Sequence, residues 1–134
     1  MAFESITLAN EAIHNPAEPR HFMRFKPVSN RIVVRVGGQI LADSVRAMRM
    51  NEVGRDLYDS VTYLPMADVS DQLKPLPDKK THCPLKGDAH YYTLDGNTPI
   101  AWSYDEPFDF SAAIKGYVAF YGDQVTLEET GTRA

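Results

Sequence analysis

The sequence predicts a mainly β single domain of the α+β class, built from antiparallel strands with two short helices. Short segments rich in β-branched and aromatic residues recur along the chain, as in Arg31–Val36 and Ile100–Tyr104. Tight-turn signals such as Gly37-Gly38 and Asp95-Gly96-Asn97 separate such segments. A chain of 134 residues suits one domain, and it can bury a core without a metal or a disulfide.

Composition and charge argue against several classes of partner. A net charge of −4 argues against nucleic-acid binding, which normally requires a basic face. No segment approaches the ~20 apolar residues of a membrane span. One cysteine and the absence of an export-type leader predict a reducing, cytoplasmic setting. A four-cysteine zinc site is excluded and no histidine pair has helical zinc spacing, so we expect no metal and no cofactor.

We divide the chain into an N-terminal arm (1–29), a β-rich domain (30–128) and a flexible tail (129–134). The prolines of 15–20 interrupt regular structure in the arm, for which a partly disordered leader is the alternative. Residues 21–26 are interpreted as an edge strand that ends at Pro27.

The clearest predicted hairpin joins 31–36 to 39–43 through Gly37-Gly38, which tolerates the positive φ of a primed turn. A two-residue loop places Val36 opposite Gln39 and Val34 opposite Leu41. The hairpin would then present one apolar face to the core, made of Ile32, Val34, Val36 and Leu41.

The middle of the chain mixes strand and helix signals. Residues 46–50 have apolar spacing of two, which favours a strand, although their composition also suits a helix. A strand over 58–64 would end at Pro65, and a helix over 66–73 would follow. The prolines of 74–80 exclude a central strand, so this segment is predicted to be a loop.

Four elements are expected in the remainder. They are a hairpin over 81–94, a strand over 100–104, a helix over 108–115 that ends at Gly116, and a hairpin joining 117–121 to 124–128. The first of these holds the only cysteine, two of the four histidines and a tyrosine pair. Whether His90 or Tyr91 neighbours Cys83 depends on a turn register that the sequence leaves open.

Ordered blocks of the chain resemble the domain of unknown function 427 family over roughly residues 30–128. These blocks are Gly37-Gly38 with Ile40–Ser44, Tyr63-Leu64-Pro65 with Asp68-Val69, Thr81–Gly87 with Tyr91-Tyr92, Ala101–Tyr104 and Ile114–Tyr121. The resemblance implies a compact curved β-domain similar to the β-tent group, which includes B-type methionine sulfoxide reductases and zinc-binding modules. The chain lacks the zinc cysteines of those relatives. A nucleotidyltransferase-like label is sometimes attached to the family.

Cys83 is the candidate catalytic residue. It would act as a nucleophile or redox thiol if His82, His90, Lys86 or Lys115 stabilised its thiolate. The alternative is a small buried apolar side chain, which is the commoner role of a free cysteine.

The candidate ligand-binding residues combine amines with aromatic rings. Lys86 and Lys115 would hold an anionic group, or else be a solvated turn lysine and a helix-terminal lysine. The rings would stack on a planar ligand, or else simply pack. The full set is Tyr63, Cys83, Lys86, Tyr92, Trp102, Tyr104 and Lys115.

The leading hypothesis is a domain that binds a small, anionic or planar ligand in a pocket near the Cys83–Lys86 hairpin. One alternative is an enzyme that uses Cys83 in thiol or redox chemistry, or a nucleotidyltransferase-like activity. The sequence has no Asp-x-Asp pair or phosphate-binding loop to support the latter. Another alternative is a non-catalytic homodimeric module that pairs through the apolar segment around Phe22, Met23 and Phe25.

Overall fold

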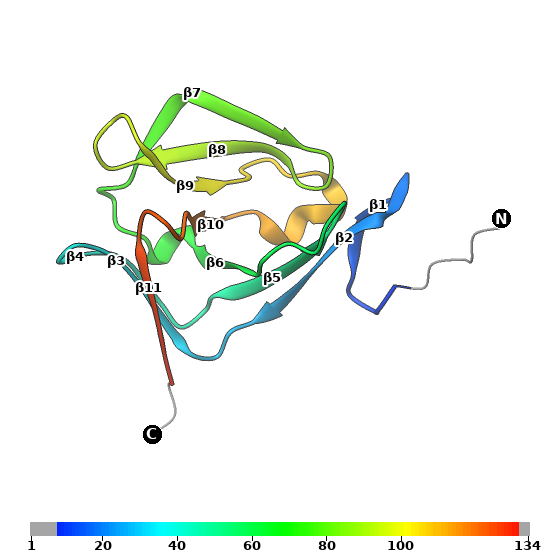
Figure 1. The fold of residues 1–134 in the computed structure, drawn as a ribbon, viewed down its shortest axis with the longest axis horizontal. Helices are drawn as coiled ribbons and strands as arrows, with labels where there is room; N and C mark the ends of the chain where they lie inside the picture. The colour runs from blue at the N-terminus through cyan, green and yellow to red at the C-terminus, as the bar shows by residue number, and fades with distance from the viewer. Residues whose placement is uncertain (1–7, 132–134) are drawn as a thin grey trace.

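The computed structural model describes residues 8–131, which form two antiparallel β-sheets (Figure 1). The mainly β class is therefore confirmed. The large sheet has eight strands in the order β1-β2-β5-β6-β10-β9-β8-β7, and the small sheet has the order β11-β3-β4. The strands are β1 Ile13–Asn15, β2 Glu18–Pro27, β3 Arg31–Val36, β4 Gln39–Ser44, β5 Met48–Val53, β6 Val61–Pro65, β7 Lys74–Cys83, β8 Gly87–Thr93, β9 Pro99–Ser103, β10 Tyr117–Phe120 and β11 Thr126–Thr130.

The strand register divides the side chains of the large sheet between two faces. Paired residues on neighbouring strands share a face, and successive residues alternate between faces. One row across β6, β10, β9 and β8 is formed by Tyr63, Ala119, Trp102 and Tyr91. We call the face that carries this row the inner face. The residues beside them in sequence, including Leu64 and Val118, therefore occupy the outer face.

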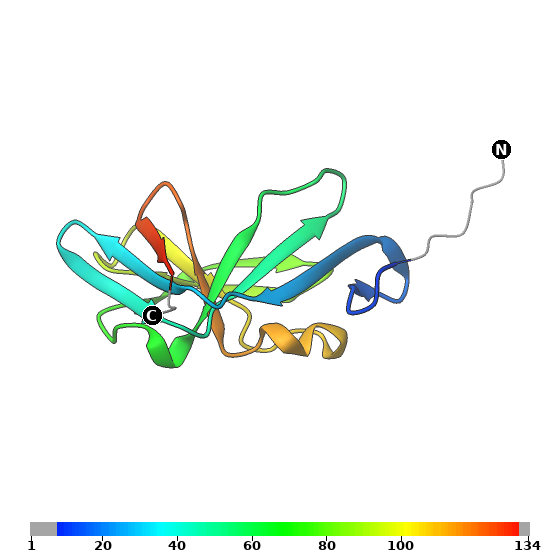
Figure 2. The same ribbon diagram turned by 90° about the horizontal axis from the view of Figure 1, so that it is seen from below.

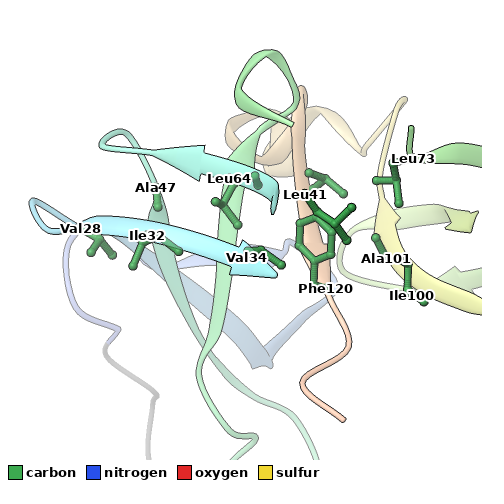
Figure 3. Close-up of a cluster of buried hydrophobic side chains, with 12 residues drawn as sticks. Val28, Ile32, Val34, Leu41, Ala47, Leu64, Leu73, Ile100, Ala101 and Phe120 are labelled. Atoms are coloured by element: carbon green, nitrogen blue, oxygen red, sulfur yellow. The ribbon is translucent and has the colours of Figure 1, made fainter. Parts of the chain in front are cut away.

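The outer face packs against the small sheet. Ile32, Val34 and Leu41 of the small sheet are fully buried there, and they pack with Leu64 and Phe120 of the large sheet, which are also buried (Figure 3). Figure 2 shows the small sheet at one end of the molecule and β1 at the other. The inner face is thus left to form its own cluster, at a distance from the small sheet.

The hairpin of β3 and β4 confirms the Gly37-Gly38 turn and the pairing of Val36 with Gln39. The expected pairing of Val34 with Leu41 is wrong, because a β-bulge makes Val34 pair with Ala42 instead. The bulge directs both Leu41 and Ala42 into buried positions.

Two further predictions about strands are corrected. Residues 74–80 are not a loop but most of β7, and their prolines are tolerated because β7 is an edge strand. The last predicted hairpin does not form, since β11 pairs with β3 while β10 lies between β6 and β9. The strand interpretation of 46–50 is supported by β5, which begins at Met48.

Neither predicted helix is present as an α-helix. The segment 66–73 is reduced to a single 3₁₀ turn, η1 Met66–Asp68. The segment 108–115 contains the 3₁₀ segment η2 Asp109–Ile114, which is interrupted by non-helical backbone angles at Ser111. Short 3₁₀ turns serve here as connectors between strands.

The segment 21–26 is a strand but not an edge strand. It belongs to β2, which pairs with β5 on one side and, over Phe22 and Met23, with β1 on the other. Met23 is fully buried, so its side chain is not part of an exposed apolar surface. At the other end of the chain, β11 continues to Thr130, two residues into the expected tail. The parts of the arm and tail at 1–7 and 132–134 lie outside the described residues.

Within residues 8–131, no helix is long and apolar enough to cross a membrane.

Candidate functional site

The inner face carries charged groups as well as rings. Glu52 follows Met48 and Met50 at spacing two on β5, so it shares their inward direction. His21 precedes Met23 by two residues on β2 and lies on the same face. The sequence therefore places a carboxylate and an imidazole where apolar side chains would be expected.

The large sheet curves around its inner face. Three strands lie between β5 and β8 in the sheet order. Nevertheless, Lys86, in the turn that joins β7 to β8, reaches across to Glu52. The two halves of the sheet must therefore bend toward each other, which makes the inner face concave and supports the expectation of a curved sheet.

The turn that carries Lys86 is held by neighbouring backbone. The amide of Phe108 donates to the carbonyl of Lys86 at 3.2 Å, and the hydroxyl of Ser111 donates to the carbonyl of Leu85 at 2.6 Å. Gly87 follows with a φ of 112°, which L side chains rarely adopt. These constraints direct the Lys86 side chain inward.

Lys86 and Glu52 form a buried ion pair. Lys86 Nζ donates to Glu52 Oε1 at 2.5 Å, and the side chains are only 6% and 10% exposed. The other carboxylate oxygen, Oε2, lies 2.7 Å from His21 Nε2, which donates because an ionised carboxylate can only accept. Both oxygens of Glu52 are thus engaged by nitrogen donors.

The pKa of Glu52 reflects a balance of opposing effects. Burial alone would raise the pKa, but the hydrogen bonds from His21 and Lys86 and the charge of Lys86 outweigh it. The pKa of the carboxyl group is therefore lowered from its ordinary value. Glu52 is consequently ionised at neutral pH, which preserves its pairing with Lys86.

Cys83 lies beside the same amine. Lys86 Nζ donates to Cys83 Sγ at 3.7 Å, and the cysteine is partly exposed. In the register of β7 and β8, Cys83 pairs with Gly87, so neither His90 nor Tyr91 lies opposite it. The question that the sequence left open is thereby resolved, and the amine of Lys86 is the basic group in contact with the thiol.

Two adjoining hollows open on this cluster. The first, which we call the polar hollow, has a volume of about 460 Å³. The second, the aromatic hollow, has a volume of about 300 Å³. Glu52 and Tyr58 line both hollows, so the hollows meet at the ion pair. The polar hollow is lined by Glu18, Arg20, His21, Glu52, Gly54, Arg55, Tyr58, His82, Cys83 and Pro84.

The aromatic hollow is walled by tyrosine and tryptophan rings. Its rings include Tyr63, Tyr91, Trp102, Tyr104 and Tyr121, and Lys86 also lines it. Tyr121 stacks on Tyr91 with an interplanar angle of 9° and a centroid distance of 6.5 Å, and its centroid is 4.8 Å from that of Trp102. Flat faces and edges of rings are thus presented around one small space.

Three phenols of this hollow, those of Tyr63, Tyr104 and Tyr121, remain protonated at neutral pH. Burial is the main cause that raises the pKa of Tyr63 and of Tyr104, and it raises the pKa of Tyr121 to about 12. Trp102 Nε1 donates to the hydroxyl of Tyr63 at 3.4 Å. These three side chains therefore offer neutral rings and hydroxyl groups rather than phenolate charges.

Five of the seven predicted ligand-binding residues lie around these hollows: Tyr63, Cys83, Lys86, Trp102 and Tyr104. Tyr92 does not, because it follows Tyr91 by one residue and so points to the outer face, where its hydroxyl is 2.8 Å from Ser103 Oγ. Lys115 is exposed at the end of η2 and lines neither hollow. The expected pair of ammonium groups is therefore not brought together.

Sequence reasoning missed Glu52 and His21. The signal for Glu52 was its position in the alternation of Met48, Met50 and Glu52, which continues an apolar face with a carboxylate. His21 similarly continues the alternation of Met23 and Phe25. A carboxylate in an inward position needs a partner. The partner of Glu52 is Lys86, which lies 34 residues away in the sequence.

A metal centre has no support among the described residues. Within 8–131, no three His, Cys, Asp or Glu side chains converge in a way that would hold a metal ion. His82, on the rim of the polar hollow, is exposed and lies 2.8 Å from Asp88, whose pKa it lowers by hydrogen bonding.

With this geometry in place, comparison with known families identifies the chain's relatives. A family model described as Domain of unknown function (DUF427) matches residues 24–131. The chain belongs to this family. The DUF427 match contains Glu52, Cys83 and Lys86, whereas His21 lies just before it. No curated protein matches the chain.

Proposed function

We propose that this DUF427 chain binds a small molecule with a planar ring, placed across the two hollows. The ring would occupy the aromatic hollow, and a polar or anionic end would extend into the polar hollow. The observation that carries the proposal is the buried Glu52–Lys86 pair at the junction of the hollows, beside several aromatic rings.

A purely structural role explains this pair poorly. Removing two charges from water costs several kcal/mol per ion, so buried pairs often contribute little to stability compared with apolar side chains. Groups with perturbed pKa values in a cleft are instead typical of functional sites. Ring-lined concave surfaces with a few convergent polar groups are also the usual form of small-molecule sites.

The charges favour the polar hollow for an anionic end of the ligand. Glu52 largely neutralises Lys86, and Lys115 is elsewhere, so two free lysines do not form an anion site. The polar hollow is instead lined by the basic residues Arg20, Arg55, His21 and His82, which outnumber its two carboxylate residues, Glu18 and Glu52. A carboxylate or phosphate there would meet these basic groups while its attached ring reached the aromatic hollow.

A ligand screen tests the proposal. Nucleosides, nucleotides, aromatic acids and sulfoxides would be screened by thermal shift, since a ligand that binds only the folded state raises the apparent stability. Trp102 is the only tryptophan, so its fluorescence reports binding in the aromatic hollow directly. We expect a planar ligand to raise the Tm and to change this fluorescence.

A matched pair of variants locates the binding site. Tyr58→Ala removes a ring that is 47% exposed and lines both hollows, whereas Leu57→Ala removes a neighbour that is 79% exposed and lines neither. Neither change removes a buried side chain. Tyr58→Ala is expected to weaken binding and Leu57→Ala to leave it unchanged; equal affinities of the two variants would count against the proposal.

Thiol chemistry at Cys83 is the second candidate function. The observation that favours it is the contact of 3.7 Å between Cys83 Sγ and Lys86 Nζ, because an adjacent ammonium stabilises a thiolate. Iodoacetamide alkylation of the folded protein, followed across pH, tests this. Reaction near neutral pH is expected, and reaction only at strongly alkaline pH, or none, would exclude this candidate.

A further inference from the structure

Lys86 differs from an ordinary ion-pair lysine in what surrounds it. Its side chain is only 6% exposed, yet it lines the aromatic hollow. Its Nζ lies 5.7 Å from the centroid of the Tyr104 ring and 2.5 Å from a carboxylate oxygen of Glu52. A primary amine is therefore presented to the place where a planar ligand would sit.

This arrangement suits covalent chemistry better than anion binding. An anion at Lys86 would be repelled by Glu52, whose carboxylate already takes the charge of the amine. A carbonyl group carries no net charge and meets no such repulsion. Lysines withdrawn from water are the ones that proteins use to form Schiff bases with carbonyl substrates.

We propose that Lys86 Nζ forms an imine with an aldehyde or ketone carried on a planar ligand in the aromatic hollow. This inference rests on the proposed function, because it requires that the ring occupy that hollow. It adds the chemical class of the ligand and the atom that reacts.

The reaction balances with groups that are present. The ammonium of Lys86 first gives one proton to Glu52, which frees the nitrogen lone pair. Nζ then forms a C–N bond to the carbonyl carbon, and the electrons of the C=O π bond move to oxygen. The C–O bond then breaks as the nitrogen lone pair forms the second C–N bond, and the oxygen leaves as water with two hydrogens that originate on Nζ. Glu52 returns its proton to the imine nitrogen. The product is a protonated C=N bond, and no oxidant, reductant or metal is consumed.

Glu52 suits both the first and the last step of this reaction. The protonated imine carries the same single positive charge as the ammonium, so the buried pair with Glu52 persists and no uncompensated charge is created. His21 binds the other oxygen of Glu52 at 2.7 Å and acts as a positioning residue that fixes the carboxylate.

Reductive trapping tests the inference with 4-hydroxybenzaldehyde as the probe. The folded protein would be treated with the aldehyde and cyanoborohydride, which converts an imine to a stable amine, and the modified lysines identified by peptide mass mapping. Because a bound ring holds its carbonyl near the amine, we expect Lys86 to be labelled about tenfold faster than exposed Lys115. Labelling that favours Lys115 and other exposed lysines would overturn the inference.

One control compound separates this inference from the proposed function. 4-Hydroxybenzyl alcohol has the same ring without the carbonyl, and it should change Trp102 fluorescence and compete with labelling. If the alcohol binds but the aldehyde is not trapped on Lys86, the imine is refuted while the ring site stands. If neither compound changes Trp102 fluorescence and Lys86 is not labelled, both proposals fail for this class of ligand.

Variants test the reacting amine and the proton acceptor. Lys86→Arg keeps a positive charge but cannot form an imine, so labelling at this position should be lost. Glu52→Gln keeps the shape of the side chain but removes the proton acceptor, and it should lower the labelling rate of Lys86 about tenfold. An unchanged rate in folded Glu52→Gln, with folding checked by circular dichroism, would contradict the role of Glu52.

Discussion

Glu52 is the residue whose substitution should have the largest effect on the molecule. It is buried, and its carboxylate accepts hydrogen bonds from both His21 and Lys86. Glu52→Leu would leave the ammonium of Lys86 buried without a partner, which typically costs about 3–5 kcal/mol. Urea unfolding of the variant and the wild type measures this loss.

A double variant distinguishes an unpaired charge from lost packing. Glu52→Leu combined with Lys86→Met removes both charges, and most of the lost stability should return. The exposed pair of Arg31 and Asp43, 2.6 Å apart, supplies the control, since Asp43→Asn should have a far smaller effect. A double variant no more stable than Glu52→Leu alone would refute the explanation.

The lowered pKa of Glu52 predicts a specific acid sensitivity. A carboxyl group whose pKa is lower in the folded state than in the unfolded state stabilises the fold at neutral pH. This contribution is lost as pH falls through its ordinary value of 4.5 and below. Stability measured across this range should therefore fall more steeply for the wild type than for Glu52→Gln. Parallel curves would show that Glu52 is not the group responsible.

At the scale of elements, the turn between β7 and β8 positions the amine, and Gly87 permits its shape. A Cβ at Gly87 would lie 3.4 Å from the carbonyl oxygen of Glu106 and would require a strained φ of 112°. Gly87→Ala should therefore destabilise the protein by about 1–2 kcal/mol. Gly122→Ala is the control, because Gly122 has no positive φ and open space around it. Thermal unfolding compares the two, and equal Tm values would contradict this reading.

The pairing of β11 with β3 leads to another prediction for an element. Removing residues 126–134 would expose the edge of β3, and with it unpaired backbone groups that favour association between chains. The truncated protein should have a lower Tm and should form larger species in light scattering. A truncated chain that remains as stable and as monodisperse as the full chain would show that β11 adds nothing.

Local pattern was sufficient for elements whose signals lie within a few residues. Alternation and a glycine pair predicted β3 and β4, and the turn residues near Asp95 predicted the end of β8. Pairing between distant segments was not visible in the same way. The order β9-β10-β6 and the pairing of β11 with β3 depend on long-range packing, which a turn signal such as Gly122-Asp123 does not specify.

Alternation also explains which site residues were predicted and which were not. Tyr92 was chosen for its residue type. It pairs with Ala101 and points to the outer face of the sheet, whereas Tyr91 points to the inner face. Lys115 was expected in the site from its position at the end of a predicted helix. That segment is a 3₁₀ segment here, and Lys115 follows it. Glu52 was overlooked because its importance comes from Lys86, which reaches it only through the curvature of the whole sheet.

At the scale of the whole molecule, the candidate site depends on the curvature of the large sheet. The small sheet packs on part of the outer face, while the inner face bends into two hollows that meet at one ion pair. A small planar ligand would fill the space between the two halves of the large sheet. It would then join β5 to the β7–β8 turn and raise the stability of both together.

The most direct measurement is a map of NMR chemical-shift changes when the strongest ligand from the screen is added. The indole N–H of Trp102 gives one signal, since the chain has a single tryptophan. This signal and the amides of Cys83, Lys86 and Tyr121 are predicted to shift, while those of Tyr92 and Lys115 stay in place. Shifts confined to Tyr92, Lys115 or the small sheet would contradict the account.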